Sequence, residues 1–134
     1  MILLDTNICI AAMNAKPAIV QDRLDRAVIH HGRAAISSIS VFELRFGVAK
    51  SMYNEANART LDVFLNSLKI LAFDEEDAAT AGAVRAQLER AGRPIGPYDY
   101  LIAGQALRHG LTLITANEKE FTRVPGLRFE NWAR

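Results

Sequence analysis

The sequence predicts an α/β fold of three layers, α/β/α, with a central, mainly parallel sheet of four to five short strands. Short apolar stretches typical of buried strands alternate along the chain with longer stretches whose apolar residues recur at helical spacing. No repeat, low-complexity tract or linker interrupts this alternation. The chain has 134 residues, 50% of them apolar, so we expect one domain over residues 1–134 with a core of its own.

Each element of the fold has a local signal. Strands are predicted at residues 2–4, 34–39, 69–73 and 111–115, with residues 127–132 as an edge strand. Helices are predicted at residues 8–13, 17–32, 40–49, 57–68, 74–92, 98–109 and 117–123. Pro17 suits a first helical position, and Ser40-x-x-Glu43 matches a capping box that opens the third helix. The glycines and prolines of residues 92–97 predict an irregular loop.

Composition excludes several classes of protein. Sixteen basic and fifteen acidic residues leave a net charge of +1, so the chain is not a general binder of polyanions. A single cysteine, Cys9, excludes a disulfide framework and suits a reducing cytoplasm. No apolar stretch approaches the roughly 18 residues of a membrane span, and Asp5 interrupts the apolar start of the chain, which argues against a secretory signal. We therefore expect a soluble cytoplasmic protein without membrane contact.

Polar residues follow the predicted strands at the points where a parallel sheet binds ligands. Asp5 follows the first strand directly, and Glu43 lies in the first turn of the helix after the second strand. Asp99 begins the helix that precedes the fourth strand, so it reaches the same edge only if the 92–97 loop folds back. The carboxyl ends of parallel strands share one edge. We therefore expect these carboxylates to lie close together.

Each of these acids also has a structural interpretation. Asp5 is a suitable N-cap, Glu43 completes the capping box, and Asp99 is stabilised by a helix dipole. Asn117-x-x-Glu120 is another pattern of the capping-box kind. The expected gathering of several acids at one edge favours a functional site over separate structural roles. Crowded carboxylates repel one another unless a cation lies among them. Oxygen ligands without His or Cys favour Mg²⁺ or Mn²⁺, and these ions suit phosphodiester chemistry.

Other catalytic patterns are absent from the sequence. Neither a phosphate-binding G-x-x-x-x-G-K-[ST] loop nor a G-x-G-x-x-G motif occurs, and no Cys or His spacing suits zinc. The histidines precede Gly32 and Gly110, where imidazoles at helix C-termini are favoured by the dipole.

Four ordered motifs carry a resemblance to a known family. They are Leu4-Asp5-Thr6-Asn7, Ser40-x-x-Glu43-Leu44-x-x-Gly47, Gly92-Arg93-Pro94-Ile95-Gly96-Pro97-Tyr98-Asp99-x-x-Ile102-Ala103 and Leu113-x-Thr115-x-Asn117-x-x-Glu120-Phe121. With them the chain resembles the PIN-domain ribonucleases, and more narrowly the VapC toxins of bacterial VapBC toxin–antitoxin pairs. The resemblance implies a PIN-like nuclease domain that cleaves RNA, halts translation and is neutralised by a VapB-type antitoxin. It also implies a homodimer that joins VapB on operator DNA.

The resemblance assigns roles to individual residues. Asp5, Glu43 and Asp99 become the acids that hold Mg²⁺, with Mn²⁺ as a substitute, and Asn117 stands where the family often has Asp. The positions expected near such a site with less specific roles are Thr6, Ser38, Thr115, Glu120 and Arg93, the last as a phosphate contact. The residue 92–99 match suggests the subgroup that cleaves initiator tRNA.

Two alternatives stay open from the sequence. A small Mg²⁺-dependent phosphatase of the haloacid dehalogenase type also has an Asp after its first strand, but its chemistry needs a second Asp two residues on, where this chain has Asn7. The other alternative is an interaction module that binds RNA or protein without cleaving it.

The apolar helix faces around 41–49 and 61–68 predict a helix-mediated dimer and a groove for the antitoxin.

Overall fold

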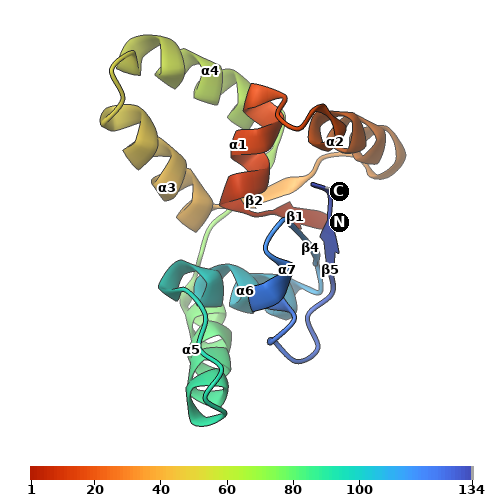
Figure 1. Ribbon diagram of the computed structural model, residues 1–134, viewed down its shortest axis with the longest axis vertical. Coiled ribbons are helices and arrows are strands. Elements are labelled where there is room, and N and C mark those ends of the chain that lie inside the picture. The colour runs from red at the N-terminus through yellow and green to blue at the C-terminus, as the bar shows by residue number, and fades with distance from the viewer. Residues whose placement is uncertain (134) are drawn as a thin grey trace.

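Five short parallel strands form the centre of the molecule, and helices cover both faces of the sheet (Figure 1). The structure, a computed structural model, describes residues 1–133. Its strands are β1 (Ile2–Leu4), β2 (Ala35–Ser37), β3 (Lys69–Leu71), β4 (Thr112–Thr115) and β5 (Phe129–Asn131). Its helices are α1 (Thr6–Asn14), α2 (Ala18–His31), α3 (Ser38–Ala49), α4 (Asn54–Asn66), α5 (Glu75–Arg90), α6 (Pro97–His109) and α7 (Glu118–Phe121).

The strand order places β1 at the centre of the sheet. The order is β3-β2-β1-β4-β5, and every pairing is parallel. The chain moves outward from β1 through β2 to β3, and then crosses to β4 on the other side of β1. The order of connection therefore reverses between β1 and β4, and at such a switch point parallel sheets open a crevice for ligands.

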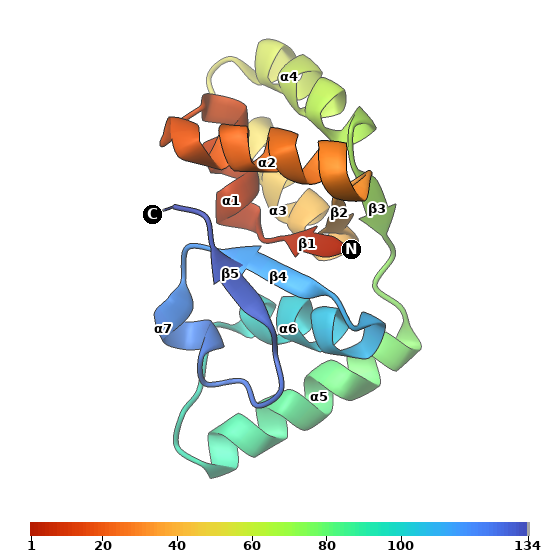
Figure 2. The same ribbon diagram turned by 90° about the vertical axis from the view of Figure 1, so that its right-hand side faces the viewer.

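Alternation of side chains along the strands builds two cores. Leu4 and Ile114 belong to the core under α1–α4, whereas Leu3 and Leu113 belong to the core on the opposite face, with α5 and α6. Figure 2 shows α1–α4 on one side of the sheet and α5–α7 on the other. The three predicted layers are thus confirmed, and the sheet is entirely parallel.

The helices of the second layer approach each other very closely at one point. A Cβ at Gly104 of α6 would lie 2.6 Å from the Cα of Ala81 in α5. Real Cβ atoms do not approach backbone this closely, so only glycine allows this contact. The close packing fixes α6, whose first turn carries Asp99.

The predicted elements occur in the predicted order, with shifted boundaries. The clearest correction concerns α3, which begins at Ser38 because the Ser37 hydroxyl accepts a hydrogen bond from Ile39 N at 3.0 Å. Ser40 is consequently buried inside the helix, and the capping box predicted for Ser40 and Glu43 is wrong. Within residues 1–133, no helix is both long and apolar enough to span a membrane.

Candidate active site

Asp5 lies at the carboxyl end of the central strand and caps the helix that follows. Its backbone N donates to Ile114 O at 3.0 Å, and its side chain accepts a hydrogen bond from Ile8 N at 2.8 Å. The predicted N-cap is therefore present, and it holds a buried carboxylate at the switch point between β1 and β4. Asp5 is thus fixed both by the sheet and by α1.

Glu43 is oriented from α1 rather than by its own helix. The Thr6 hydroxyl donates to Glu43 Oε1 at 2.8 Å and lies 2.9 Å from the buried Ser40 hydroxyl. A capping glutamate would instead accept a backbone N–H at the start of its helix. The carboxylate of Glu43 is therefore held towards Asp5, which is the residue before Thr6.

The Gly/Pro loop folds back and brings Asp99 to the same edge. Two contacts fix the loop, because Ile95 N donates to the Tyr100 hydroxyl at 3.0 Å and Arg123 Nη1 donates to Pro94 O at 2.7 Å. A Cβ at Gly96 would lie 2.9 Å from Asp99 Oδ2. Glycine at this position leaves the room that the Asp99 carboxylate occupies.

The pKa values record how closely the acids approach one another. Burial raises the pKa of Asp99 to about 8, assisted by its hydrogen bond with Glu120 and by the charges of Glu120, Asp5 and Glu43. Burial also raises the pKa of Asp5, against the hydrogen bonds from Thr115 and Ile8 N, and Glu43 adds to the rise. The structure therefore gathers Asp5, Glu43, Asp99 and Glu120 into one group, which we name the acidic site.

Asn117 and Glu120 form a second part of the same edge. Asn117 Nδ2 donates to Glu120 Oε2 at 3.1 Å, and Gly96 N lies 3.5 Å from the same oxygen. Asn117 precedes α7 but its side chain does not cap that helix. The hydrogen bond from Asp99 is the main cause that lowers the pKa of Glu120. Glu120 therefore carries the negative charge of the Asp99–Glu120 pair.

The remaining predicted positions divide into two groups. Thr115 lies in the site, since its hydroxyl bonds to Asp5 and accepts from Asn117 N at 2.9 Å. Ser38 accepts from Phe73 N at 3.0 Å, so it anchors the segment after β3 and makes no hydrogen bond to these acids in the described chain. The exposed Arg93 side chain makes no hydrogen bond within residues 1–133. Sequence reasoning missed Ser40 and Arg123 as supports, because their partners lie far along the chain.

The donor set of the acidic site fits a divalent metal ion. All the potential ligand atoms of the site are oxygens. Asp5, Glu43 and Asp99 take part in none of the ion pairs found within residues 1–133. Hard oxygen donors with uncompensated charge suit Mg²⁺ or Mn²⁺. In the described part of the chain, no three His, Cys, Asp or Glu side chains are already spaced around one ion position. These side chains would therefore have to move before they could surround an ion.

Comparison with known proteins gives one consistent result. The family model of the PIN domain matches residues 2–127. The tRNA(fMet)-specific endonuclease VapC of Shigella flexneri is 42% identical over 131 residues, covering 98% of this chain and 97% of that protein. Ribonuclease VapC2 of Rickettsia felis is also 42% identical, covering 97% of this chain and 96% of that protein.

Solved structures agree with the sequence relatives. The crystal structure of VapBC2 from Rickettsia felis bound to a DNA fragment from their promoter matches with a TM-score of 0.91 at 42% identity, covering 98% of this chain and 99% of that chain. The crystal structure of DNA-bound VapBC from Salmonella typhimurium matches with a TM-score of 0.90 at 40% identity, over 98% and 99% of the two chains. PIN-domain nucleases generally depend on divalent metal ions. With its motifs, fold and relatives in agreement, the chain belongs to the VapC ribonucleases of the PIN-domain family.

Proposed function

We propose that this chain, as a single nuclease domain over residues 1–134, is a metal-dependent endoribonuclease toxin that cleaves RNA and thereby inhibits translation. One observation carries the proposal: Asp5, Glu43 and Asp99 converge at the switch point of the sheet, and no cation of the described chain pairs with them. The VapC relatives, named as ribonucleases and endonucleases, support the same reaction.

Asp5, Asp99 and Glu43 would hold Mg²⁺, with Mn²⁺ as a substitute. Bound there, the ion supplies positive charge to the phosphodiester oxygens and makes water more acidic. The protein's own contribution is to fix the ligands, through α1 for Asp5 and through the folded-back loop for Asp99. Asp99 would have to release the proton that it shares with Glu120 before its carboxylate could serve this task.

The other groups of the site act on the substrate and on water. Glu43 orients or deprotonates the attacking water, and the Thr6 hydroxyl keeps its carboxylate in place. Asn117 hydrogen-bonds to water or a phosphate oxygen, and Arg93 contacts a phosphate of the RNA. Water attacks the phosphorus, the bond from phosphorus to the 3′ oxygen breaks and that oxygen takes up a proton, so the products carry 5′-phosphate and 3′-hydroxyl ends.

Initiator tRNA is the substrate that the relatives favour. Two of them, from Shigella flexneri and Salmonella typhimurium, are named tRNA(fMet)-specific endonucleases and are 42% and 41% identical to this chain. Their similarity extends over 98% and 97% of the chain. We therefore expect this chain to cleave the same tRNA.

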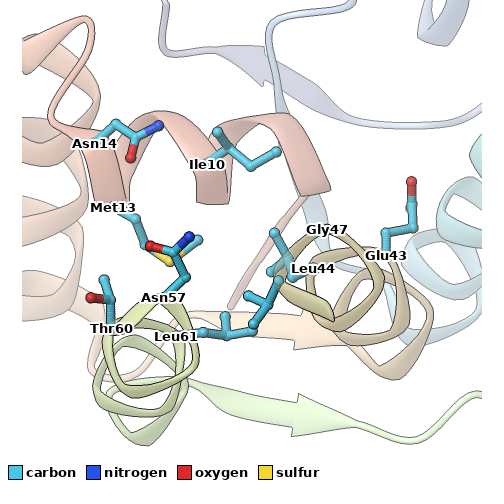
Figure 3. A pocket seen from close by; sticks show the side chains of 10 residues that line it. Ile10, Met13, Asn14, Glu43, Leu44, Gly47, Asn57, Thr60 and Leu61 are labelled. Carbon is cyan, nitrogen blue, oxygen red and sulfur yellow. The ribbon is translucent and has the colours of Figure 1, made fainter. Parts of the chain in front are cut away.

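An apolar groove beside the acidic site suits an inhibitory partner. It lies between α1, α3 and α4, with Ile10, Met13, Leu44 and Leu61 on its walls (Figure 3). Glu43 stands at one end of this groove, away from Asn57 and Thr60. An apolar segment of a VapB-type antitoxin laid in the groove would reach the acidic site and block it.

The partners follow from the same relatives. Structures of VapBC complexes on DNA are the solved structures that match this chain with TM-scores of 0.91 and 0.90. We propose that this chain forms a homodimer and joins its antitoxin in a complex on operator DNA. Light scattering of the purified chain should show the dimer. Induction of the chain alone should stop growth, and co-expression of the neighbouring small reading frame should restore it.

Cleavage of initiator tRNA by purified, antitoxin-free protein tests the proposal. The protein should produce one mapped 5′-phosphate end with Mg²⁺ and none with EDTA. Cleavage that persists in EDTA would overturn the metal-dependent mechanism. Hydrolysis of small phosphomonoesters without cleavage of RNA would indicate the phosphatase, and RNA binding without cleavage would indicate an interaction module.

A further inference from the structure

Two exposed aromatic rings stand beside the acidic site. Phe42 of α3 is 55% exposed and Tyr98 of α6 is 45% exposed. Their centroids lie 6.1 Å apart with an angle of 64° between the ring planes, which is an edge-to-face contact. We name these two residues the aromatic pair. Neither ring belongs to the two hydrophobic cores of the protein, so burial does not explain why they are aromatic.

The aromatic pair is coupled to the acids by sequence and by geometry. Phe42 directly precedes Glu43, and Tyr98 directly precedes Asp99. Consecutive residues of a helix point about 100° apart, so each ring flanks the neighbouring carboxylate on the same turn. The charges of Glu43 and Asp99 act on each other. The same approach of α3 to α6 therefore brings together both the acids and the rings.

The geometry of the pair leaves aromatic surface for another planar group. In an edge-to-face contact, only one face of one ring is covered by the partner ring. Nucleobases that are not stacked in a helix bind to such surfaces, and aromatic stacking accepts any base because every base has a π-face. An RNA whose phosphate lies at the acids presents a neighbouring base beside them.

We propose that Phe42 and Tyr98 stack on the unpaired nucleobase that flanks the scissile phosphate, and thereby select cleavage sites in single-stranded or loop RNA. The proposal rests on the ribonuclease function proposed above. A base inside a duplex is already stacked on its neighbours and cannot reach the rings without leaving the helix. The aromatic pair thus contributes recognition of the nucleotide, while the acids carry out the hydrolysis.

An RNA that lacks the flanking base provides the test. After the cut made by the wild-type protein is mapped, the nucleotides on each side of it are replaced in turn by an abasic ribose. At one of the two positions, the replacement should lower kcat/KM about 10- to 100-fold, the expected effect of one stacked base. The double variant Phe42→Leu/Tyr98→Leu should lose as much on intact RNA and almost nothing further on the abasic RNA.

Matched variants separate stacking from other roles of the rings. Tyr98→Phe keeps the ring and should retain much more cleavage of intact RNA than Tyr98→Leu. Phe46→Leu removes a ring that is 57% exposed one turn further along α3, and should affect kcat/KM much less than Phe42→Leu. In the Asp5→Asn background, 2-aminopurine at the sensitive position should be quenched on binding, and Phe42→Leu should remove the quenching.

The outcomes distinguish the two proposals. If the wild-type protein does not cleave RNA, the proposed function fails before the variants are compared. If it cleaves and the double variant cleaves intact RNA equally well, the stacking proposal alone is overturned. It is also overturned if the double variant loses equal activity on intact and abasic RNA while light scattering shows that it no longer self-associates, because the rings would then serve contact between copies.

Discussion

Two clusters of carboxylates in this protein differ in whether a cation of the protein pairs with the acids. The first, which we name the α5–α6 cluster, consists of Asp74, Glu76 and Asp77 with Arg108 and His109. Arg108 Nη1 lies 2.9 Å from both Asp74 Oδ1 and Asp77 Oδ1, and its Nη2 pairs with Glu76. The hydrogen bond from Asp77 N is the main cause that lowers the pKa of Asp74, and Arg108 assists.

In the acidic site, Asp5, Glu43 and Asp99 form no ion pair within residues 1–133, and only Glu120 has a cation nearby, Arg123, whose charge helps to lower the pKa of Glu120. Burial and neighbouring acids raise the pKa of Asp99 to about 8, and burial raises that of Asp5. In the α5–α6 cluster Arg108 pairs directly with the acids, whereas Asp5, Glu43 and Asp99 of the acidic site have no such partner within residues 1–133. Clustered acids thus indicate a functional site only where their charge lacks a partner within the protein.

Removal of divalent metal should produce the largest difference between the clusters. With EDTA, RNA cleavage should fall to the rate without protein, and added Mg²⁺ should restore it. Mg²⁺ at about one hundred times its Kd should also raise the free energy of unfolding by about 2.7 kcal/mol, measured by denaturation. Asp99→Asn should abolish this stabilisation, whereas Asp74→Asn, in the α5–α6 cluster, should leave it intact. Equal stabilisation of both variants by Mg²⁺ would contradict the assignment.

The next largest effect is expected at Glu43. Gln can still accept the hydrogen bond from Thr6, so Glu43→Gln should melt within a few degrees of the parent. The glutamine side chain cannot take a proton from water. Loss of a positioned base lowers the rate by about 10²–10⁴-fold. Single-turnover cleavage measures this loss, with Glu76→Gln of the α5–α6 cluster as the matched control. A Glu43→Gln protein that cleaves at the parental rate would remove Glu43 from the chemistry.

Features that depend on local sequence could be predicted, whereas features that depend on the packed structure could not. Strand and helix periods are local, so the alternation of elements and the position of Asp5 after β1 are readable from the sequence. The N-cap of α3 depends on where β2 ends. Two serines, Ser37 and Ser40, both fit that role locally, and the structure uses Ser37. The prediction at Ser40 failed for this reason.

Contacts between segments far apart in the chain could not be predicted from local sequence patterns. Arg108 pairs with Asp74 across 34 positions, and the hydroxyl of Thr6 reaches Glu43 across 37. The close approach of Asp99 to Glu120 depends on the return of the residue 92–97 loop, which glycine at 96 permits. The sequence places acids near one edge, but only the packed chain decides which of them acquire a cation.

A change in stability alone is expected at Arg108. Arg108→Leu leaves the buried carboxylate of Asp77 without its main cation, and breaking a pair of this kind costs roughly 2–4 kcal/mol. Urea denaturation should show this loss, while kcat of the folded protein stays the same. Arg45→Leu breaks the exposed pair with Asp62 and should cost less than about 1 kcal/mol. Equal costs for the two variants would show that the α5–α6 cluster is only a surface network.

A smaller effect on activity is expected at Thr6. Thr6→Val keeps the shape of the side chain but removes the hydroxyl that holds Glu43. Supporting partners of this kind typically contribute about 10- to 100-fold to activity or metal affinity. Thr6→Ser keeps the hydroxyl and should stay near the parental kcat. If Thr6→Val and Thr6→Ser cleave at the same rate, the hydrogen bond from Thr6 to Glu43 does not contribute to activity.

The smallest effect is a pH dependence of stability with opposite sign at Asp99 of the acidic site and at Asp74 of the α5–α6 cluster. In the folded, metal-free protein, Asp99 keeps its proton up to about pH 8, whereas its ordinary pKa is 3.8. Between these values the unfolded chain binds fewer protons than the folded one, so the contribution of Asp99 to stability is lost as the pH rises. Glu120, whose pKa is lowered, contributes stability that is lost only as the pH falls below its ordinary range.

Melting curves of three proteins in EDTA resolve these signs. Asp99→Asn should melt close to the parent at pH 5, and a few degrees above it at pH 8.5, where the parent carries an additional buried charge. Asp74 has a lowered pKa, so its contribution is present at neutral pH and is lost as the pH falls through its folded pKa. Asp74→Asn should therefore melt below the parent at pH 7, and the difference should shrink in acid. Parallel melting curves for Asp99→Asn and the parent across this range would mean that Asp99 is already ionised at neutral pH, and that its charge is balanced within the protein like the acids of the α5–α6 cluster.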